Sequence, residues 1–152
     1  MKYYYTYQTP LDELWIVEEN NFIIEIKYKI NFQEIERKET PLIKETYQQL
    51  TQYFEGKRKT FDIPIKLQGT AFQKKVWTTL QTIPYGNVCS YKQLAQTVGL
   101  PKGYRAVGMA NNRNPISILV PCHRVTGING NLVGYAGGID KKRFLLELEQ
   151  KF

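Results

Sequence analysis

The strongest candidates for catalytic side chains lie in the segment 114–125, which has the sequence NPISILVPCHRV. The apolar run of this segment ends at Pro121, which is followed by Cys122 and by His123, the single histidine of the chain. A cysteine thiolate is a strong nucleophile, and an imidazole can remove the thiol proton. Because adjacent side chains usually diverge, we expect His123 to act on Cys122 through a bridging water. A buried, inert cysteine is the competing interpretation.

A histidine in this role needs an acidic side chain to orient it. Glu147 and Glu149 both lie on the amphipathic helix predicted after Asp140, and the residues alone leave the choice between them open. A cysteine hydrolase is an alternative chemistry. Such sites usually draw a histidine and an asparagine from distant segments, and this chain has no second histidine.

The charge of the chain is divided unevenly. Residues 1–65 carry nine Lys or Arg against eleven Asp or Glu, a balance of −2, and residues 66–152 carry twelve against three, a balance of +9. A basic half of this kind often contacts phosphate backbones, although a merely soluble basic domain is the alternative. There is no apolar run of membrane-spanning length and no secretory signal, so we expect a cytoplasmic protein without a membrane partner.

Cysteine usage agrees with that compartment. The two cysteines, Cys89 and Cys122, can form at most one disulfide, and with one histidine they cannot make a four-ligand zinc site of the usual types. We therefore predict two free thiols in a reducing compartment, with no metal and no other cofactor.

The first half of the chain predicts a small antiparallel sheet with one helix. Period-two alternation of apolar residues predicts strands at residues 3–7, 14–16 and 22–30, and a further short strand at residues 60–67. Thr40 and Pro41 suit the N-cap and first position of a helix that Gly56 would end. We interpret this half, residues 1–65, as a scaffold domain.

The second half, residues 66–152, predicts mostly short helices. Thr70 caps a first helix, and Ser90 with Gln93 fits the capping box of a second, which Gly99 would close. A third helix begins near Gly103. Two short helices around a tight turn indicate a helix-turn-helix, which together with the basic charge favours DNA binding.

The second helix of this pair is unusual for a protein that reads a DNA sequence. Its segment RAVGMANN, residues 105–112, consists mainly of small residues, and Arg105 is its one long side chain. Such a helix can approach DNA closely but offers few groups to the edges of the bases in the major groove. We therefore expect contact with the minor groove, or inspection of individual bases, with little sequence specificity.

Five segments of the second half resemble the O6-alkylguanine-DNA alkyltransferase family, also called methylated-DNA–protein-cysteine methyltransferases. They are, in chain order, GTAFQKKVW, IPYGNVCSY, RAVGMANNRNP, PCHRV and NLVGYAGG. The first half resembles the N-terminal domain of this family only in its layout. The resemblance implies an α/β (α+β) fold, in which a ribonuclease H-like domain precedes a winged helix-turn-helix domain that carries the reactive cysteine.

The resemblance also implies DNA repair by direct reversal of damage. Cys122 would take the alkyl group from O6-alkylguanine in double-stranded DNA and keep it, in a single turnover, with no cofactor and as a monomer. O4-alkylthymine is a further candidate substrate. The family's relay of cysteine, water, histidine and glutamate maps onto Cys122, His123 and Glu149, which selects Glu149 over Glu147.

Residues that hold the DNA follow from the same resemblance. Arg105 would enter the duplex in place of a flipped nucleotide, because the alkyl group inside the stack cannot be reached by an in-line thiolate. Tyr91 would crowd the phosphate of that nucleotide and donate a hydrogen bond to guanine N3, which helps O6 to leave. Ser90 and Ala106 join these residues at the DNA. The resemblance places a hinge at Asn114 and lines the substrate pocket with it and with Val125, Tyr135, Ala136 and Gly137.

Two positions differ from some relatives, which carry a proline in place of Ser117 and a serine in place of Ala136, and both differences bear on the tolerance of bulky alkyl groups. Some relatives also bind a structural zinc for which this chain lacks ligands. Two other classes of function remain as alternatives. A damage-recognition protein that does not react would lack the cysteine of PCHRV, and a winged-helix transcription regulator is disfavoured by the small side chains of residues 105–112.

Overall fold

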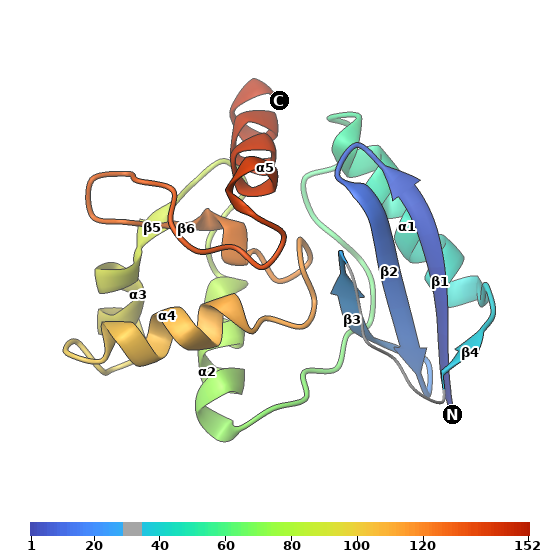
Figure 1. The fold of residues 1–152 in the computed structure, drawn as a ribbon, viewed down its shortest axis with the longest axis horizontal. Helices are drawn as coiled ribbons and strands as arrows, with labels where there is room; N and C mark the ends of the chain where they lie inside the picture. The colour runs from blue at the N-terminus through green and yellow to red at the C-terminus, as the bar shows by residue number, and fades with distance from the viewer. Residues whose placement is uncertain (29–34) are drawn as a thin grey trace. The chain divides into compact units, whose positions relative to one another are not determined.

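The computed structural model describes residues 1–28 and 35–152, which form two compact units, residues 1–67 and residues 68–152 (Figure 1). The predicted end of the third strand, at Ile30, lies outside the described residues. Among the helices that are described, none has the length and apolar character needed to cross a membrane.

The first unit is a four-stranded sheet in the order β3-β2-β1-β4. The three antiparallel strands that the sequence predicts are confirmed as β1 (Lys2–Thr9), β2 (Asp12–Glu19) and β3 (Phe22–Lys27). A short strand that was not predicted, β4 (Glu36–Arg37), pairs in parallel with β1. Tight turns join the antiparallel strands, whereas a parallel neighbour needs a longer connection.

The strand predicted at residues 60–67 is wrong. Only Ile65 forms a bridge, which is parallel and pairs it with Ile23. The amide of Ile23 donates to the carbonyl of Pro64 at 2.9 Å, and the amide of Lys66 donates to the carbonyl of Ile23 at 3.0 Å. A proline has no N–H to donate to a ladder, so the segment touches the sheet at one point and does not extend it.

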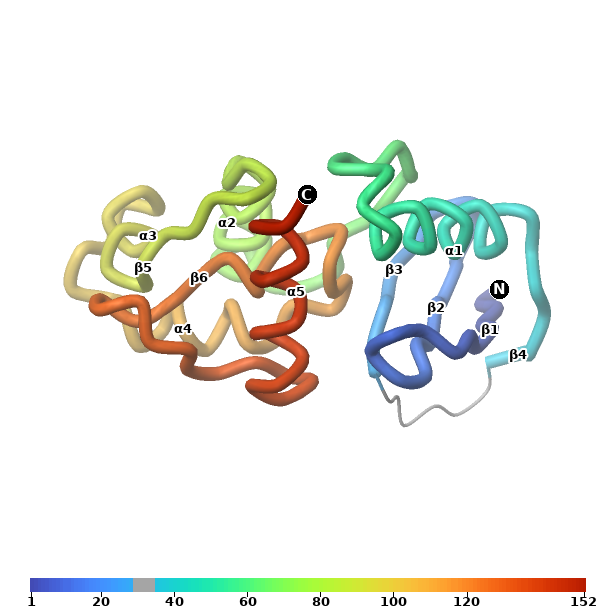
Figure 2. Tube along the Cα trace, turned by 90° about the horizontal axis from the view of Figure 1, so that it is seen from above, coloured from blue at the N-terminus to red at the C-terminus, as the bar shows by residue number. Residues whose placement is uncertain are grey.

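One helix, α1 (Pro41–Phe54), packs along a face of this sheet (Figures 1 and 2). Its start agrees with the sequence, since Thr40 Oγ1 accepts a hydrogen bond from the amide of Ile43 at 3.1 Å. The same hydroxyl donates to Glu18 Oε1 at 2.6 Å, which ties the helix to β2. The core of the unit is formed by fully buried side chains of α1 and of the sheet, which include Leu14, Ile16, Ile26, Ile43, Leu50 and Tyr53.

The second unit consists mainly of helices. They are α2 (Ala71–Leu80), α3 (Tyr91–Thr97), α4 (Tyr104–Asn112) and α5 (Ile139–Lys151), with a 3-10 turn η1 (Cys122–Arg124) and the short strands β5 (Cys89–Ser90) and β6 (Val125–Thr126). The caps predicted at Thr70 and Ser90 are both present as complete capping boxes. The predicted helix-turn-helix corresponds to α3 and α4, which pack against each other and against α2.

The strands β5 and β6 connect this helix pair to the cysteine segment. They pair in parallel, with Cys89 opposite Val125 and Ser90 opposite Thr126. Ser90 is the N-cap of α3, and Val125 directly follows η1. The pairing therefore places the first turn of α3 beside the cysteine segment, and α5 also packs against η1.

Candidate active site

Cys122 is placed by a turn that Asn114 holds in shape. The side-chain amide of Asn114 donates to the carbonyl of Val120 at 2.7 Å, and its oxygen accepts from the amide of Ile116 at 3.0 Å. Within this turn Ile118 has a φ of +73°, a conformation that costs a β-branched residue about 1–3 kcal/mol. The two hydrogen bonds of Asn114 offset that cost. The turn they stabilise places Cys122, which is 4% exposed, at the first position of η1.

The next residue, His123, is fully buried and is held by a carboxylate from α5. Its Nε2 lies 2.7 Å from Glu149 Oε2. Arg124 donates to both oxygens of the same carboxylate, from Nε to Oε1 and from Nη2 to Oε2, each at 2.9 Å. Arg124 also donates to the carbonyl of Ile83 at 2.7 Å, and the amide of Gly86 donates to Glu149 Oε1 at 3.2 Å. Glu149 is therefore an ionised, fully hydrogen-bonded carboxylate.

This carboxylate determines the tautomer of His123. An ionised carboxylate can only accept, so Nε2 of the neutral imidazole carries the proton and Nδ1 presents a lone pair. Burial lowers the pKa of His123 below its ordinary 6.5, and the positive charges of Arg124 and Lys142 lower it further, against the opposing effect of Glu149. In the described part of the chain, the buried Nδ1 has no hydrogen-bond partner. His123 is thus a neutral base with its accepting nitrogen unused.

The thiol beside this base is strongly protonated. Burial raises the pKa of Cys122 from its ordinary 9.0 to about 11, although a hydrogen bond from Asn114 and the charge of Lys142 act in the opposite direction. At neutral pH such a cysteine is almost entirely a thiol, so it must lose its proton during any reaction in which it is the nucleophile. The other cysteine, Cys89, is half-buried in β5, and burial raises its pKa as well.

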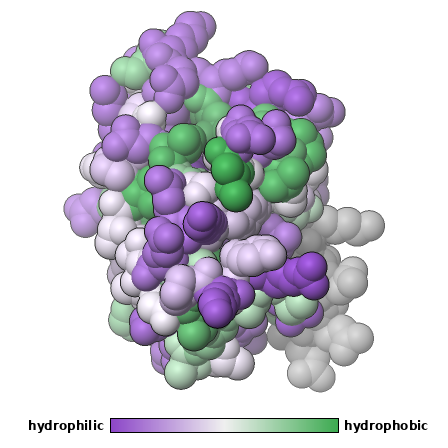
Figure 3. Space-filling view, turned by 90° about the vertical axis from the view of Figure 1, so that its left-hand side faces the viewer, coloured by the Kyte–Doolittle hydropathy of each residue, from purple (hydrophilic) through white to green (hydrophobic). Residues whose placement is uncertain are grey.

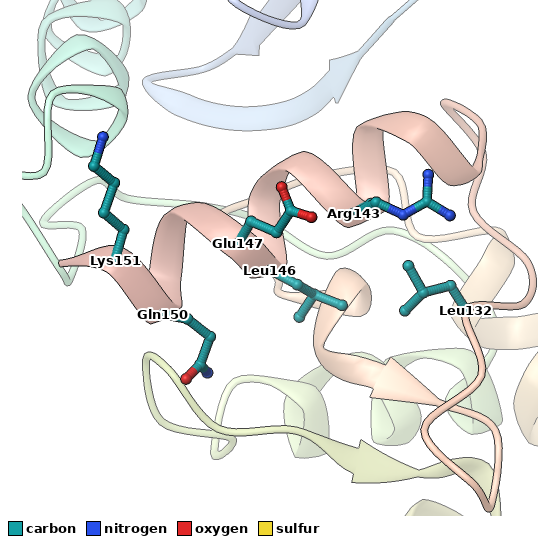
Figure 4. A pocket seen from close by; sticks show the side chains of 6 residues that line it. All are labelled: Leu132, Arg143, Leu146, Glu147, Gln150 and Lys151. Atoms are coloured by element: carbon teal, nitrogen blue, oxygen red, sulfur yellow. The ribbon is translucent and has the colours of Figure 1, made fainter.

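The two glutamates that the residues alone left as alternatives lie in different surroundings. Glu149 is 4% exposed and faces His123. Glu147 is exposed and lines a shallow hollow of about 590 Å³ on the surface along α5, together with Leu132 and Leu146 (Figure 4). The geometry therefore allows only Glu149 to orient the imidazole.

A cavity of about 290 Å³ opens between α4 and the loop that precedes α5. It is lined by Tyr91, Tyr104, Gly108, Asn112, Val133 and Gly134. The hydroxyl of Tyr91 donates to the carbonyl of Val133 at 2.9 Å, which joins α3 to the loop wall. The predicted pocket residues Tyr135, Ala136 and Gly137 follow these loop residues directly but are not among the lining, and Val125 is fully buried in β6.

Sequence reasoning missed most of this lining. Tyr104, Gly108 and Asn112 are spaced four residues apart, so they share one face of α4. This spacing indicates a possible binding face, because a glycine in the middle of a helix leaves room for a neighbour or a ligand. Two charged residues, Arg124 and Lys142, were also missed, since neither was expected to be buried.

The residues predicted to touch DNA lie on the surface of the helix pair. Arg105 and Ala106 are exposed on α4, and Arg105 makes no side-chain hydrogen bond or ion pair with the described residues. Ser90 accepts from the amide of Gln93 at 3.0 Å, so its hydroxyl proton can still be donated outward. Figure 3 shows the side of the molecule on which α3 and α4 lie, where hydrophobic patches are interspersed with hydrophilic side chains.

A helix-turn-helix beside a buried cysteine and an oriented histidine defines a class of protein that joins a DNA-binding fold to thiol chemistry. Comparison with known families makes the assignment specific. Residues 2–67 match the family described as "6-O-methylguanine DNA methyltransferase, ribonuclease-like domain", and residues 71–151 match "6-O-methylguanine DNA methyltransferase, DNA binding domain". The chain therefore belongs to the 6-O-methylguanine DNA methyltransferase family, which confirms the resemblance found in the sequence.

Individual relatives extend over almost the whole chain. The constitutive methylated-DNA–protein-cysteine methyltransferase of Bacillus subtilis is 49% identical, over 99% of this chain and 96% of its own length. The methyltransferase of Methanosarcina acetivorans is 44% identical, over 97% of each chain. A crystal structure of Mycobacterium tuberculosis OGT in complex with DNA has a TM-score of 0.92 at 40% identity, covering 98% of this chain and 93% of that one. The predicted α/β fold class is thereby confirmed.

The hydrogen bonds of Asn114 predict a stability effect. Asn114→Ala removes the acceptor of the buried Ile116 amide and one donor to the carbonyl of Val120, so we expect the free energy of unfolding to fall by roughly 2–3 kcal/mol. Urea denaturation measures this loss. Asn112→Ala is the matched control, because Asn112 is exposed and should change stability by no more than about 0.5 kcal/mol. Equal effects of the two substitutions would contradict the bracing role of Asn114.

Proposed function

We propose that this chain removes an alkyl group from O6 of guanine in double-stranded DNA and retains it on Sγ of Cys122. Membership of the family makes the protein a DNA-repair methyltransferase that transfers the group to one of its own cysteines. The observation that carries the assignment to Cys122 is its neighbour His123, a buried neutral base whose Nδ1 is unused by the described residues. The other cysteine, Cys89, lies in β5 and is proposed to be a bystander.

The reaction is an in-line displacement at the alkyl carbon. The thiolate of Cys122 forms a sulfur–carbon bond while the bond from that carbon to O6 breaks, and the electron pair of the broken bond goes to the guanine. A soft sulfur nucleophile suits this saturated carbon. The product is a stable thioether, and no group of the site breaks its new sulfur–carbon bond, so the protein is consumed one molecule for each lesion. We propose no cofactor, because the thiol supplies the nucleophile.

The proton of the Cys122 thiol is proposed to leave through His123. No direct hydrogen bond joins the two side chains in the described structure, so a bridging water is the proposed carrier, with Nδ1 as its acceptor. The imidazolium that forms is stabilised by the carboxylate of Glu149 at 2.7 Å. Arg124 holds both oxygens of that carboxylate, which keeps it ionised and fixes the ring orientation.

Tyr91 is proposed to help the guanine leave. Burial raises the pKa of its hydroxyl, so the group remains a proton donor at neutral pH. Its present acceptor is the carbonyl of Val133, in the wall of the cavity. An extruded guanine in that cavity would present N3 to the same hydroxyl, and a hydrogen bond there stabilises the negative charge that develops when O6 departs.

The helix α4 is proposed to enter the minor groove. Its exposed residues Arg105 and Ala106 give close approach with one long cation, which suits replacement of a flipped nucleotide. Ser90, at the N-cap of α3, is placed to donate to a phosphate. The neighbouring structure crystallised with DNA, at 40% identity, supports a DNA partner.

We further propose that the protein works as a monomer in the cytoplasm. Both cysteines are free thiols, which suits a reducing compartment. The reaction as proposed needs only one chain, because Cys122, His123, Glu149 and Tyr91 all belong to the second unit. The first unit is proposed to act as a scaffold.

The proposed acceptor predicts a clear result by intact mass spectrometry. After incubation with a duplex that contains O6-methylguanine, the protein should gain one methyl group, and peptide mapping should place it on Cys122. Cys122→Ser should show no gain while still binding DNA, because the exposed surface of α4 is unchanged. Cys89→Ala should react at nearly the normal rate. A methyl gain in Cys122→Ser would refute the assignment, and binding without a gain in the unchanged protein would favour a non-reacting damage sensor.

The role of Arg105 predicts a difference between two substrates. Arg105→Ala should slow transfer from duplex O6-methylguanine by about tenfold or more, as expected for a loss of at least roughly 1.4 kcal/mol in the flipped state. It should hardly change the reaction with free O6-benzylguanine, which needs no extrusion. Single-turnover kinetics measure both. Arg113→Ala, which removes the same charge from an exposed position at the end of α4, is the matched control. Equal losses on both substrates would refute insertion of Arg105.

A further inference from the structure

Asn111 is a buried amide that the mechanism above does not use. It belongs to α4 and is 1% exposed. Its Nδ2 donates to the backbone carbonyl of Cys122 at 3.4 Å. A carbonyl oxygen can only accept, so this contact orients the amide with Nδ2 toward the cysteine and Oδ1 turned away from its carbonyl. Among the described residues, the buried Oδ1 has no hydrogen-bond partner.

An acceptor in this state is costly for the fold. On burial it loses its hydrogen bonds to water and gains none from the described residues in return. An apolar side chain of the same shape, such as leucine, would avoid this cost. The unused oxygen of Asn111 therefore points to a donor that a ligand brings.

The position of Asn111 on α4 places this oxygen beside the proposed base pocket. Gly108, one turn earlier, lines the cavity, and a Cβ atom added to Gly108 would lie 3.6 Å from Cδ1 of Tyr91. Residues three apart are neighbours on a helix surface, so Asn111 follows Gly108 alongside the Tyr91 ring. Burial raises the pKa of the Tyr91 hydroxyl, and a hydrogen bond with Asn111 acts against this rise, in agreement with that placement. Asn111 thus adjoins both Tyr91 and Cys122.

The hydrogen-bonding groups of an O6-alkylated guanine identify the donor. Alkylation of O6 leaves N1 without a hydrogen, so N1, N3 and N7 can all only accept. The exocyclic amine on C2 is then the one N–H donor of the base in DNA, and it lies directly beside N3. When Tyr91 donates to N3, this amine comes next to the Tyr91 hydroxyl, where it needs an acceptor. An O4-alkylated thymine has no N–H donor at all.

We infer that Asn111 is a specificity-determining residue, whose Oδ1 accepts a hydrogen bond from the exocyclic amine of the extruded guanine while Tyr91 donates to N3. The inference rests on the proposed function, in which guanine is brought to Cys122. A site with a buried acceptor for a substrate N–H discriminates against an analogue that lacks it. Asn111 therefore favours alkylated guanine over alkylated thymine.

Two substrates that differ only in this amine test the inference in the full-length protein. Duplexes that carry O6-methylguanine or O6-methylhypoxanthine at the same position are compared by single-turnover kinetics of methyl transfer. The ratio of the two rates should favour O6-methylguanine in the unchanged protein. Asn111→Leu should lower this ratio by about five- to tenfold, as expected for the loss of one hydrogen bond. Pairing differences between the two duplexes act on every variant alike and cancel in this comparison.

Further variants separate the acceptor from the shape of the side chain. Asn111→Ala gives the same comparison if Asn111→Leu does not fold. Asn111→Asp keeps an acceptor, so it should retain the ratio of the unchanged protein although both reactions slow. Asn131→Ala, which alters an exposed asparagine in the loop before α5, is the matched control and should leave the ratio unchanged.

A purely structural role of Asn111 would slow both reactions together. An unchanged ratio in Asn111→Leu and Asn111→Ala would therefore overturn the inference, whether or not the rates fall. Failure of the unchanged protein to take the methyl group of either duplex onto Cys122 would instead refute the proposed function, so the two failures are distinguishable.

Discussion

The buried carboxylate of Glu149 is shared by the imidazole of His123 and the guanidinium of Arg124, and this sharing decides which atom of His123 can take a proton. An isolated carboxylate in this position would be very costly, and the bidentate arginine compensates for its burial. Because Glu149 belongs to α5 whereas His123 and Arg124 belong to η1, the same contact also fixes the cysteine segment against the terminal helix. The orientation of His123 and the packing of η1 against α5 therefore depend on one group.

The helix α5 joins the cysteine segment to the rest of the second unit at two buried side chains. Glu149 lies 2.7 Å from Nε2 of His123, and Lys142, about two turns earlier, donates to the carbonyls of Val133 and Gly134 in the loop that lines the cavity. On a helix this spacing corresponds to about 10 Å along the axis. One helix therefore fixes both the imidazole and the wall of the cavity.

The features that the sequence predicted well are local. Thr40 and Ser90 could be recognised as helix caps because a cap depends on residues three positions apart, and Cys122 with His123 could be recognised because both groups lie in one segment. Glu149 required the family resemblance, since nothing local separates it from Glu147. The burial of Arg124 and Lys142 could not be predicted from the sequence, because charged residues are normally exposed and the hydrogen-bond partners of these two side chains come from other segments. The strand predicted at residues 60–67 does not form, because Pro64 has no N–H to donate and the segment pairs with the sheet only at Ile65.

The central claim is that His123 is a neutral base with its proton on Nε2 and a free lone pair on Nδ1. Since the chain has one histidine, nitrogen NMR of protein labelled with ¹⁵N-histidine reports this group alone. At neutral pH the spectrum should show Nε2 protonated and Nδ1 unprotonated, and the ring should stay neutral at pH 6.5, where an ordinary histidine is half protonated. A spectrum with the proton on Nδ1, or with both nitrogens protonated at neutral pH, would contradict the account.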